Sequence, residues 1–521
     1  MSSTTLSSGE TAVSPFARFI THPYIRTIAA ALGLFLLSAV LFAFVQYGTD
    51  ALAGNDGYYH VKMGWLIRQE GLKPAFLWLP QTILNPDAFY DHHLLYHVYL
   101  ALFAAVDPAV DGGAALTQSA KTASVILPSL AFVAVWWLLR GQQVRWPALW
   151  ALALFMVSEA FLYRMSMPRA QSASLLVLAL GLHWLFKEKF WLLIPLGFLY
   201  VWLYNAFPLL LVLGGVYLVA TLLTERRLVW QAVAFPALGI ILGVVVNPYF
   251  PQNVTFIISH LLPKIGGSAT RVGNEWYPYE TATLLSNSGG ALAAFVLGAM
   301  ALGWQKTRMN RATLTALTLA VIFGLMLFQS RRFVEYFPAF ALIFAALSIS
   351  PVLAEWEEWL KGKRPFLRYL IPLTFFALLL APLQNTLVDA RASLADAKPA
   401  DRYAAAALWL RQEAPAGSKI FQTDWDDFTR LFFYNTDVIY TAGLDPTYLE
   451  LYDADLFEQW VDISEGQVEN PSEKIRELFD GDYVFSDLNH KKFIEQAEAD
   501  PNLREIYRDE DAVIYAVKPV D

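Results

Sequence analysis

Residues 27–47 of the chain read TIAAALGLFLLSAVLFAFVQY, and soon afterwards the sequence continues Asn55-Asp56-Gly57-Tyr58-Tyr59-His60. The first stretch carries no charged side chain and has the length of about 20 residues that a helix needs to cross a bilayer. We therefore predict a membrane span that is followed, just outside the bilayer, by an acid among aromatic side chains. Such an acid indicates chemistry at a membrane surface, on a substrate that lies partly in lipid.

The composition extends this prediction to a polytopic α-helical membrane protein. Of the 521 residues, 56% are hydrophobic and 16% are charged, whereas ordinary domains carry about 25% charged residues. The run 190–223 is too long for one span, and Asn205 and Pro208 mark the expected break. In all, the apolar runs predict eleven spans, at about 27–47, 119–139, 146–163, 170–186, 190–206, 207–223, 229–246, 290–304, 312–328, 333–350 and 367–383.

Charge divides the chain into a membrane part and a soluble part. Residues 384–521 contain 13 basic and 29 acidic residues, a net charge of −16, and the rest contains 25 basic and 17 acidic residues, a net charge of +8. We expect a cytoplasmic tail at 1–26, a transmembrane domain at 27–383 and an acidic soluble domain at 384–521. Alternating strand and helix patterns predict that the last is a small α/β domain. We expect no nucleic-acid partner, and the absence of cysteine excludes disulfides and thiolate metal sites.

The charges of the loops orient the spans, and the ambiguous segment is 94–106. If it is a span, everything downstream inverts. If it is not, the basic groups of the loops all fall on one side, which is the positive-inside pattern with a cytoplasmic N-terminus. We adopt the second interpretation. It places the long loops 48–118 and 247–289 and the C-terminal domain on the outer face, and we expect a multi-pass protein of a prokaryotic inner membrane.

Two acids in these outer loops are candidates for catalysis. Asp56 is either a turn residue, because Asn-Asp-Gly favours a turn, or a general base or cation ligand. Glu275 lies in Gly273-Asn274-Glu275-Trp276-Tyr277-Pro278-Tyr279-Glu280. Loops as long as its own, about forty residues, are usually functional or disordered.

A cluster of histidines in the first outer loop raises the question of a metal. Asp91-His92-His93 is followed by His97, and on a helix residues four apart share a face. His93 and His97 are therefore a possible metal pair, with Asp91 or Asp56 as a third ligand. The alternative is an interfacial helix that simply favours histidine and tyrosine. We carry forward Mg2+ or Mn2+ as a possible cofactor, held by Asp56, Glu275 and His93.

Four arginines stand at outer ends of spans, against the positive-inside trend: Arg164, Arg169, Arg331 and Arg332. A single arginine there would reach for lipid headgroups. Four near two acid-bearing loops predict a site for an anionic group, because the planar guanidinium binds phosphate through two hydrogen bonds.

A further candidate is Thr423-Asp424-Trp425-Asp426-Asp427-Phe428, which follows an expected strand of the outer domain. Asp426 or Asp427 either caps the next helix or takes part in docking an acceptor. In the second case Trp425 supplies a flat contact and the acids accept hydrogen bonds. We also expect Tyr58 in an acceptor site.

In their order along the chain these motifs resemble those of the GT-C superfamily of membrane glycosyltransferases, and within it the catalytic subunit of oligosaccharyltransferases. The second acidic motif of that family is replaced here by Met167-Pro168-Arg169-Ala170-Gln171, and its Trp-Trp-Asp motif is altered. The resemblance rests on Asn55-Asp56-Gly57-Tyr58, Tyr163-Arg164-Met165-Ser166, Glu275, Arg332-Phe333 and Asp424-Trp425-Asp426-Asp427-Phe428.

The resemblance implies a polyprenyl-phosphate-linked sugar donor, inversion at the anomeric carbon and a protein, lipid or glycan acceptor, but not N-linked protein glycosylation. We expect Asp56 to activate the acceptor. Arg332 and Arg169 would neutralise the departing phosphate, with or without a cation held by Asp56 and Glu275. The alternatives are a polyprenyl-glycolipid transporter or binding protein and a non-catalytic scaffold that binds the acceptor.

Overall fold

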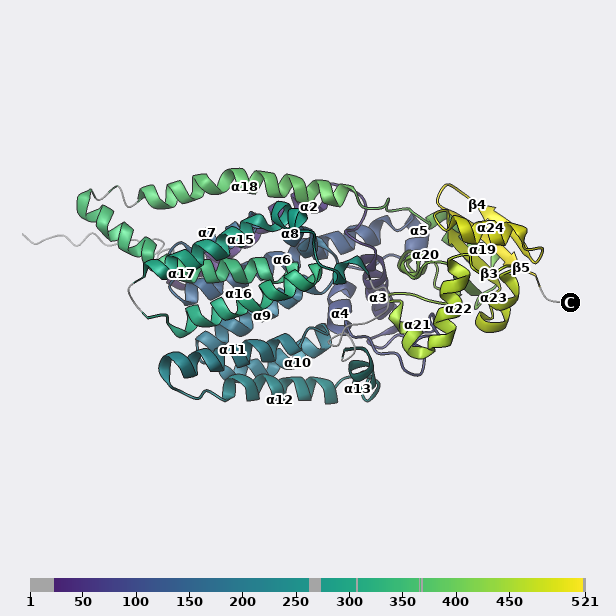
Figure 1. Cartoon of the computed structure of the whole chain (residues 1–521), viewed down its shortest axis with the longest axis horizontal. Coiled ribbons are helices and arrows are strands. Elements are labelled where there is room, and N and C mark those ends of the chain that lie inside the picture. The colour runs from purple at the N-terminus through teal and green to yellow at the C-terminus, as the bar shows by residue number, and fades with distance from the viewer. Residues whose placement is uncertain (1–22, 262–272, 306–307, 365, 367–368, 519–521) are drawn as a thin grey trace, which may run out of the picture.

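The computed structural model describes residues 23–261, 273–305, 308–364, 366 and 369–518. It consists of an elongated helical bundle with an α/β domain at one end (Figure 1). Within the described residues, seven helices are long and apolar enough to cross a membrane. They are α2 (Pro23–Gln46), α6 (Ala114–Gly141), α11 (Pro208–Glu225), α15 (Thr281–Trp304), α16 (Arg311–Gln329), α17 (Phe337–Lys363) and α18 (Leu370–Ala395). The expected polytopic helical membrane architecture is thereby confirmed.

Shorter apolar helices complete the bundle: α9 (Gln171–Phe186), η1 (Phe190–Leu192) with α10 (Leu193–Leu203), and α12 (Gln231–Val245). The predicted break in the run 190–223 is confirmed, because α10 ends at Leu203 and α11 begins at Pro208. Proline suits the first position of a helix, where its missing N–H is not needed.

The predicted span 146–163 is not a single helix. It is divided into α7 (Pro147–Ala153) and α8 (Glu159–Ser166). The hydroxyl of Ser158 accepts a hydrogen bond from the Phe161 N–H at 3.0 Å and so begins the second helix. The Val157 carbonyl accepts from the Ala291 N–H of α15 at 2.8 Å. The break between α7 and α8 is therefore stabilised by contact with α15. The number of membrane crossings stays a prediction.

The loops predicted to lie on the outer face contain short helices: α3 (Asp56–Glu70), α4 (Leu94–Ala101), α5 (Pro108–Asp111), α13 (Gln252–Phe256), η2 (Ile257–Leu261), η3 (Asn274–Trp276) and η4 (Arg331–Glu335). The ambiguous segment 94–106 forms α4, whose eight residues are far too few to cross a bilayer. It packs against α3 and α10 near the α/β domain (Figure 1). This is the local structure expected if the segment belongs to the first outer loop.

The C-terminal domain is the expected small α/β domain. Its strands are β1 (Lys419–Gln422), β2 (Ile439–Tyr440), β3 (Tyr483–Asp487), β4 (Leu503–Arg508) and β5 (Ala512–Val517), in the order β2-β1-β3-β5-β4. The first three are parallel, whereas β5 runs antiparallel to both β3 and β4. Around the sheet lie α19 (Ala404–Glu413), η6 (Trp425–Asp427), α20 (Phe428–Tyr434), α21 (Thr447–Tyr452), α22 (Ala454–Ser464), α23 (Ser472–Phe479) and α24 (Lys491–Ala499).

Backbone hydrogen bonds join the first outer loop to this domain, although the paired residues are more than 350 positions apart in the sequence. The Tyr440 N–H donates to the Trp78 carbonyl at 2.9 Å, and the Ile83 N–H donates to the Tyr448 carbonyl at 3.1 Å. The indole of Trp78 also donates to the Thr436 carbonyl at 2.8 Å. The two segments therefore form one body, which closes over one end of the bundle (Figure 1).

Candidate active site

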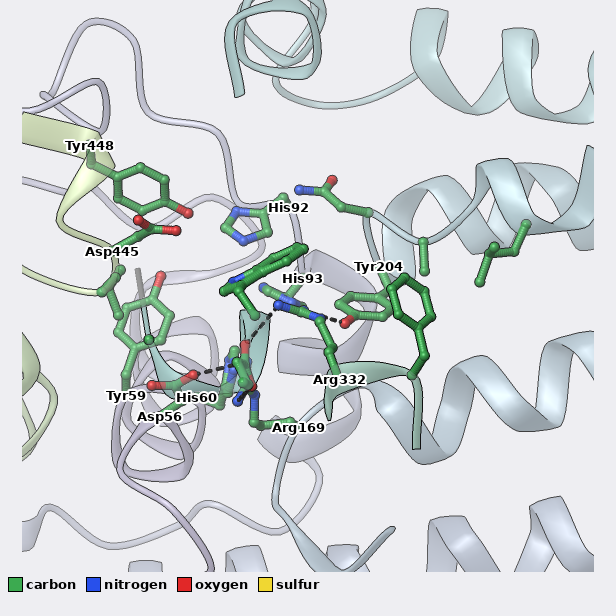
Figure 2. A pocket seen from close by; sticks show the side chains of 18 of the residues that line it. Asp56, Tyr59, His60, His92, His93, Arg169, Tyr204, Arg332, Asp445 and Tyr448 are labelled. Carbon is green, nitrogen blue, oxygen red and sulfur yellow. Dashed lines mark hydrogen bonds and ion pairs between the residues drawn. The ribbon is translucent and has the colours of Figure 1, made fainter. Parts of the chain in front are cut away.

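A cavity of about 390 Å3 lies where the bundle meets this body (Figure 2). Six of the residues singled out from the sequence line it: Asp56, His93, Arg169, Glu275, Arg332 and Trp425. They come from α3, the turn after α8, η3, η4, η6 and the start of α4, so the fold gathers distant segments into one site.

Asp56 is the first residue of α3, and a close contact places it beside Arg169. A Cβ atom on Gly57 would lie 2.2 Å from Cγ of Pro168, so only glycine lets α3 begin against the turn that carries the arginine. Arg169 Nη2 lies 3.1 Å from Asp56 Oδ2. The same guanidinium reaches Glu275, with Nη1 at 3.5 Å from Oε2. Arg169 thus lies between the two candidate catalytic acids.

Glu275 is held by three arginines. Oε2 lies 2.7 Å from Arg164 Nη1, and Oε1 lies 2.8 Å from Arg332 Nη1. Burial acts to raise the pKa of Glu275, but Arg332, Arg169 and Arg164 together hold that pKa well below its usual value of 4.5. Glu275 is therefore an anion at neutral pH, and it organises the cations around it.

Arg332 is fixed by two further contacts. Its Nη2 donates to the hydroxyl of Tyr204 at 2.7 Å, as drawn in Figure 2, and its guanidinium lies 4.9 Å from the ring centre of Trp276. The hydroxyl of Ser330, one position before η4, donates to the Glu275 carbonyl at 2.9 Å. This bond ties η4 to η3 and keeps Arg332 beside Glu275.

Arg164 and Arg331 face a second cavity, of about 400 Å3, on the other side of Glu275. Arg164 is also paired with Glu335, which is fully buried, through Nε at 3.0 Å from Oε1. Nε of Arg331 donates to the Pro278 carbonyl at 3.2 Å, and the guanidinium lies 5.3 Å from the ring centre of Tyr279. Of the four predicted phosphate-binding arginines, the structure brings only Arg169 and Arg332 into the first cavity.

The predicted acceptor-binding residues also fall into two groups, those that line the first cavity and those that do not. Trp425 lines the first cavity, whereas Tyr58 and Asp426 hold the first outer loop to the C-terminal domain. Asp426 accepts a hydrogen bond from Asn55, and the ring of Tyr58 lies 4.3 Å below the guanidinium of Arg430. Asp427 is buried, and this burial, with Asp424 and Asp487 nearby, raises its pKa well above the usual 3.8.

The side chains do not fit a divalent cation held by Asp56, Glu275 and His93. Both acids are already bridged by Arg169. His93 stacks on Tyr204 with 5.4 Å between ring centres, and its expected partner His97 is hydrogen-bonded elsewhere. Among the residues that the structure describes, no three His, Asp or Glu side chains are arranged to hold a metal ion.

The cavity contains residues that the sequence analysis did not single out, notably Tyr59, His60, Tyr204, Asp445 and Tyr448. The signal for His60 was present, because it lies four positions after Asp56 and therefore on the same face of a helix. Asp445 and Tyr448 enter from the C-terminal domain, and no local pattern in their sequence points to the cavity.

A bundle of membrane-spanning helices, long outer loops and an α/β domain that closes a charged cavity together define the GT-C fold. No family profile and no curated protein sequence matches the chain, but solved structures do. The oligosaccharyltransferase of Archaeoglobus fulgidus superposes with a TM-score of 0.64 at 14% identity over 94% of this chain and 75% of its own. The ArnT protein of Cupriavidus metallidurans, bound to undecaprenyl phosphate, does so with a TM-score of 0.52 at 15% identity over 95% and 97%.

The archaeal oligosaccharyltransferase is also known in complex with an inhibitory peptide and a dolichol-phosphate, and that structure superposes with a TM-score of 0.61 at 13% identity. The likeness to these structures confirms the GT-C fold inferred from the order of the motifs. The chain is accordingly a multi-pass membrane protein with the fold of these glycosyltransferases.

Proposed function

We propose that the chain is an inverting glycosyltransferase that transfers a sugar or glycan from a polyprenyl-phosphate-linked donor to an acceptor on the extracytoplasmic face. The observation that carries the proposal is the row of alternating charges Asp56, Arg169, Glu275 and Arg332 at the cavity. Such a row supplies both an acid for the acceptor and cations for a leaving phosphate. Solved proteins of the same fold bind dolichol-phosphate and undecaprenyl phosphate.

Arg169 and Arg332 bind the phosphate of the donor in this mechanism. A guanidinium has five N–H donors, and the contacts with Asp56, Glu275 and Tyr204 engage only some of them. The remaining donors are available to phosphate oxygens. A fixed cation in a site that excludes water stabilises the charge that develops as the phosphate leaves.

Arg169 takes the place that a metal ion would otherwise hold between Asp56 and Glu275. A bound divalent cation would supply charge to the same phosphate, but the arginine delivers that charge from the chain itself. We therefore propose that transfer is independent of divalent cations, and that Asp56, with part of its carboxylate open to the cavity, accepts the acceptor proton.

The walls of the cavity suit the lipid part of such a donor. Leu209 of α11, Met326 of α16 and Phe333 of η4 all line it. Helices α11 and α16 belong to the membrane bundle, so the apolar wall continues from the charged row towards the lipid. The first isoprene units of the donor would lie against these three side chains.

The decisive experiment is mass spectrometry of polyprenyl glycolipids and surface glycans in a strain without the protein, complemented with wild type or Asp56→Ala. Transfer predicts that the lipid-linked donor accumulates, and the glycan product disappears, in both the deletion strain and Asp56→Ala. Asp50→Asn, an exposed acid of the same loop, is the matched control and should restore the product. An unchanged product with Asp56→Ala would instead favour a transporter, a binding protein or a scaffold.

A further inference from the structure

A chain of hydrogen bonds leads from the cavity into the packed interior of the first outer loop. Nδ1 of His60 lies 2.8 Å from Nε2 of His97, and Nδ1 of His97 lies 2.7 Å from Oδ2 of Asp91. Asp91, His97 and His60 are 2%, 0% and 3% exposed. The sequence pattern had paired His97 with His93, but the structure pairs it with His60.

The direction of each hydrogen bond follows from the chemistry of the groups. An ionised Asp91 can only accept, so Nδ1 of His97 must carry a proton. In a neutral His97 the other nitrogen, Nε2, then accepts, so Nδ1 of His60 must be the donor. This leaves Nε2 of His60 without a proton, as a hydrogen-bond acceptor.

That nitrogen belongs to a ring that lines the cavity. Asp56 and His60 stand four positions apart on α3 and therefore on the same face of the helix. Within the described residues, no hydrogen bond to Nε2 of His60 is formed, whereas Nδ1 is committed to His97. Nε2 is thus the end of the chain of hydrogen bonds that can meet a proton in the site.

The surroundings of His60 disfavour a positive charge on its ring, and a carboxylate lies beside the next ring of the chain, His97. Burial, His97 and Arg169 together lower the pKa of His60 well below its usual 6.5. A charge on His97 would instead lie directly beside the carboxylate of Asp91, at 2.7 Å. A proton that enters at His60 is therefore most stable when the charge moves one ring further inwards.

We propose that His60, His97 and Asp91 form a proton relay that takes up the proton of the acceptor during glycosyl transfer. The inference rests on the proposed function. As the acceptor oxygen bonds to the anomeric carbon, the bond from that carbon to the phosphate oxygen breaks and leaves its electron pair on the phosphate. The acceptor proton passes to Asp56 and on to Nε2 of His60.

The proton on Nδ1 of His60 moves at the same time to Nε2 of His97. One proton has entered the relay, and the positive charge rests on His97 beside the Asp91 carboxylate. Asp56 is again an anion, ready to keep its contact with Arg169. When the product has left, the proton returns along the same path to water entering the cavity. His60 is therefore a catalytic residue, whereas Asp91 acts through His97.

The first test is His60→Ala in the purified full-length protein, assayed with its polyprenyl-linked donor. We expect kcat to fall at least about 100-fold, the usual contribution of a positioned proton acceptor, with KM for the donor unchanged. Imidazole added to the buffer should restore part of kcat. His490→Gln is the matched control, because His490 is also paired with an acid, Asp487, at 2.6 Å, but lies in the C-terminal domain away from the cavity. It should keep wild-type kcat.

The second test separates relay from positioning. In His97→Gln the amide can accept from His60 and donate to Asp91, but it cannot carry a proton. A relay predicts that His97→Gln loses as much kcat as His60→Ala, with an unchanged melting temperature. Wild-type kcat in His97→Gln would overturn the relay, as would a loss in His60→Ala that imidazole does not restore while the protein stays folded.

A third measurement does not depend on transfer. In 15N NMR of the histidine side chains, assigned with His60→Gln and His97→Gln, we expect His60 to be neutral at pH 7 with its proton on Nδ1. A proton on Nε2, or a charged ring, would overturn the relay. If the wild type transfers no sugar from any polyprenyl donor, the proposed function fails, and the NMR result still decides whether the hydrogen-bond chain is arranged as inferred.

Discussion

Glu275 separates two cavities of similar volume, about 390 and 400 Å3, whose arginines are used differently. In the first, Arg169 and Arg332 meet an acid, a tyrosine and apolar walls, and both keep hydrogen-bond donors for a ligand. In the second, Arg164 is locked to the buried Glu335, and Arg331 is bound to a backbone carbonyl. The comparison teaches that the cavity an arginine faces, and not its distance from Glu275 alone, separates the two arginines of the proposed phosphate site from the other two.

The largest effect should come from Arg169→Ala. It removes the cation between Asp56 and Glu275, and loss of one preorganised donor to a developing charge typically lowers kcat about 100- to 1,000-fold. The measurement is kcat of the purified protein with its polyprenyl-linked donor. Wild-type activity should persist in EDTA. Complete loss in EDTA, restored by Mg2+ or Mn2+, would contradict the role given to Arg169.

Arg332→Ala should reduce activity less than Arg169→Ala, and mostly by weakening the binding of the donor. A hydrogen bond to a charged group contributes about 1.5–3 kcal/mol, so kcat/KM should fall roughly 10- to 100-fold. Arg331→Ala is the control from the next position, and it should stay near wild type because its guanidinium faces the second cavity. Equal losses in the two variants would erase the distinction between the cavities.

Arg164→Ala should act on stability more than on catalysis. It leaves the Glu335 carboxylate buried without its partner, which typically costs about 3–5 kcal/mol. The expected result is a lower melting temperature in detergent or nanodiscs. The double variant Arg164→Met, Glu335→Leu should recover much of the loss, because it removes both charges. A normal melting temperature together with abolished transfer would contradict this prediction and give Arg164 a direct role in catalysis.

Mild acid should have the smallest effect, and this effect is on the contribution of Glu275 to the melting temperature. The folded-state pKa of Glu275 lies well below its usual value, so its contribution to stability is full above the unfolded pKa of about 4.3 and is lost as the pH falls through the folded pKa. The difference in melting temperature between wild type and Glu275→Gln should stay constant from pH 7 to pH 5. It should shrink only below that range, and a change already at pH 6 would show that the three arginines do not control Glu275.

The sequence predicted the parts of the fold that depend on local patterns. Long apolar runs located the spans, and Pro208 located the break between α10 and α11. The divided helix at 146–163 was missed, although Ser158 followed by Glu159 inside the run is a helix-start signal. Strand β4 carried no clear signal in the sequence because half of its residues are exposed and it lies at the edge of the sheet. A helix after Asp427 was one of the two alternatives for the motif at 423–428, and α20 does begin at Phe428, although the Asp427 side chain makes no capping hydrogen bond.

The sequence predicted which charged residues form the site, but it did not predict which of them contact one another. Asp56, Glu275, Arg169 and Arg332 were all selected from the sequence, because charge at an outer membrane surface stands out. The sequence could not show that Arg164 belongs to Glu335 or that His97 belongs to His60. Those choices depend on which helices pack together, and residues up to 171 positions apart are involved.

The hydrogen bonds between the first outer loop and the C-terminal domain have a consequence for biosynthesis. The ribosome makes residues 48–118 long before the strands and helices that Trp78 and Ile83 contact. Asp56 is therefore synthesised early, but the wall formed by Trp425 and Tyr448 arrives with the last quarter of the chain. A nascent or truncated polypeptide has the acid without its enclosure, so the cavity is complete only when synthesis is nearly finished.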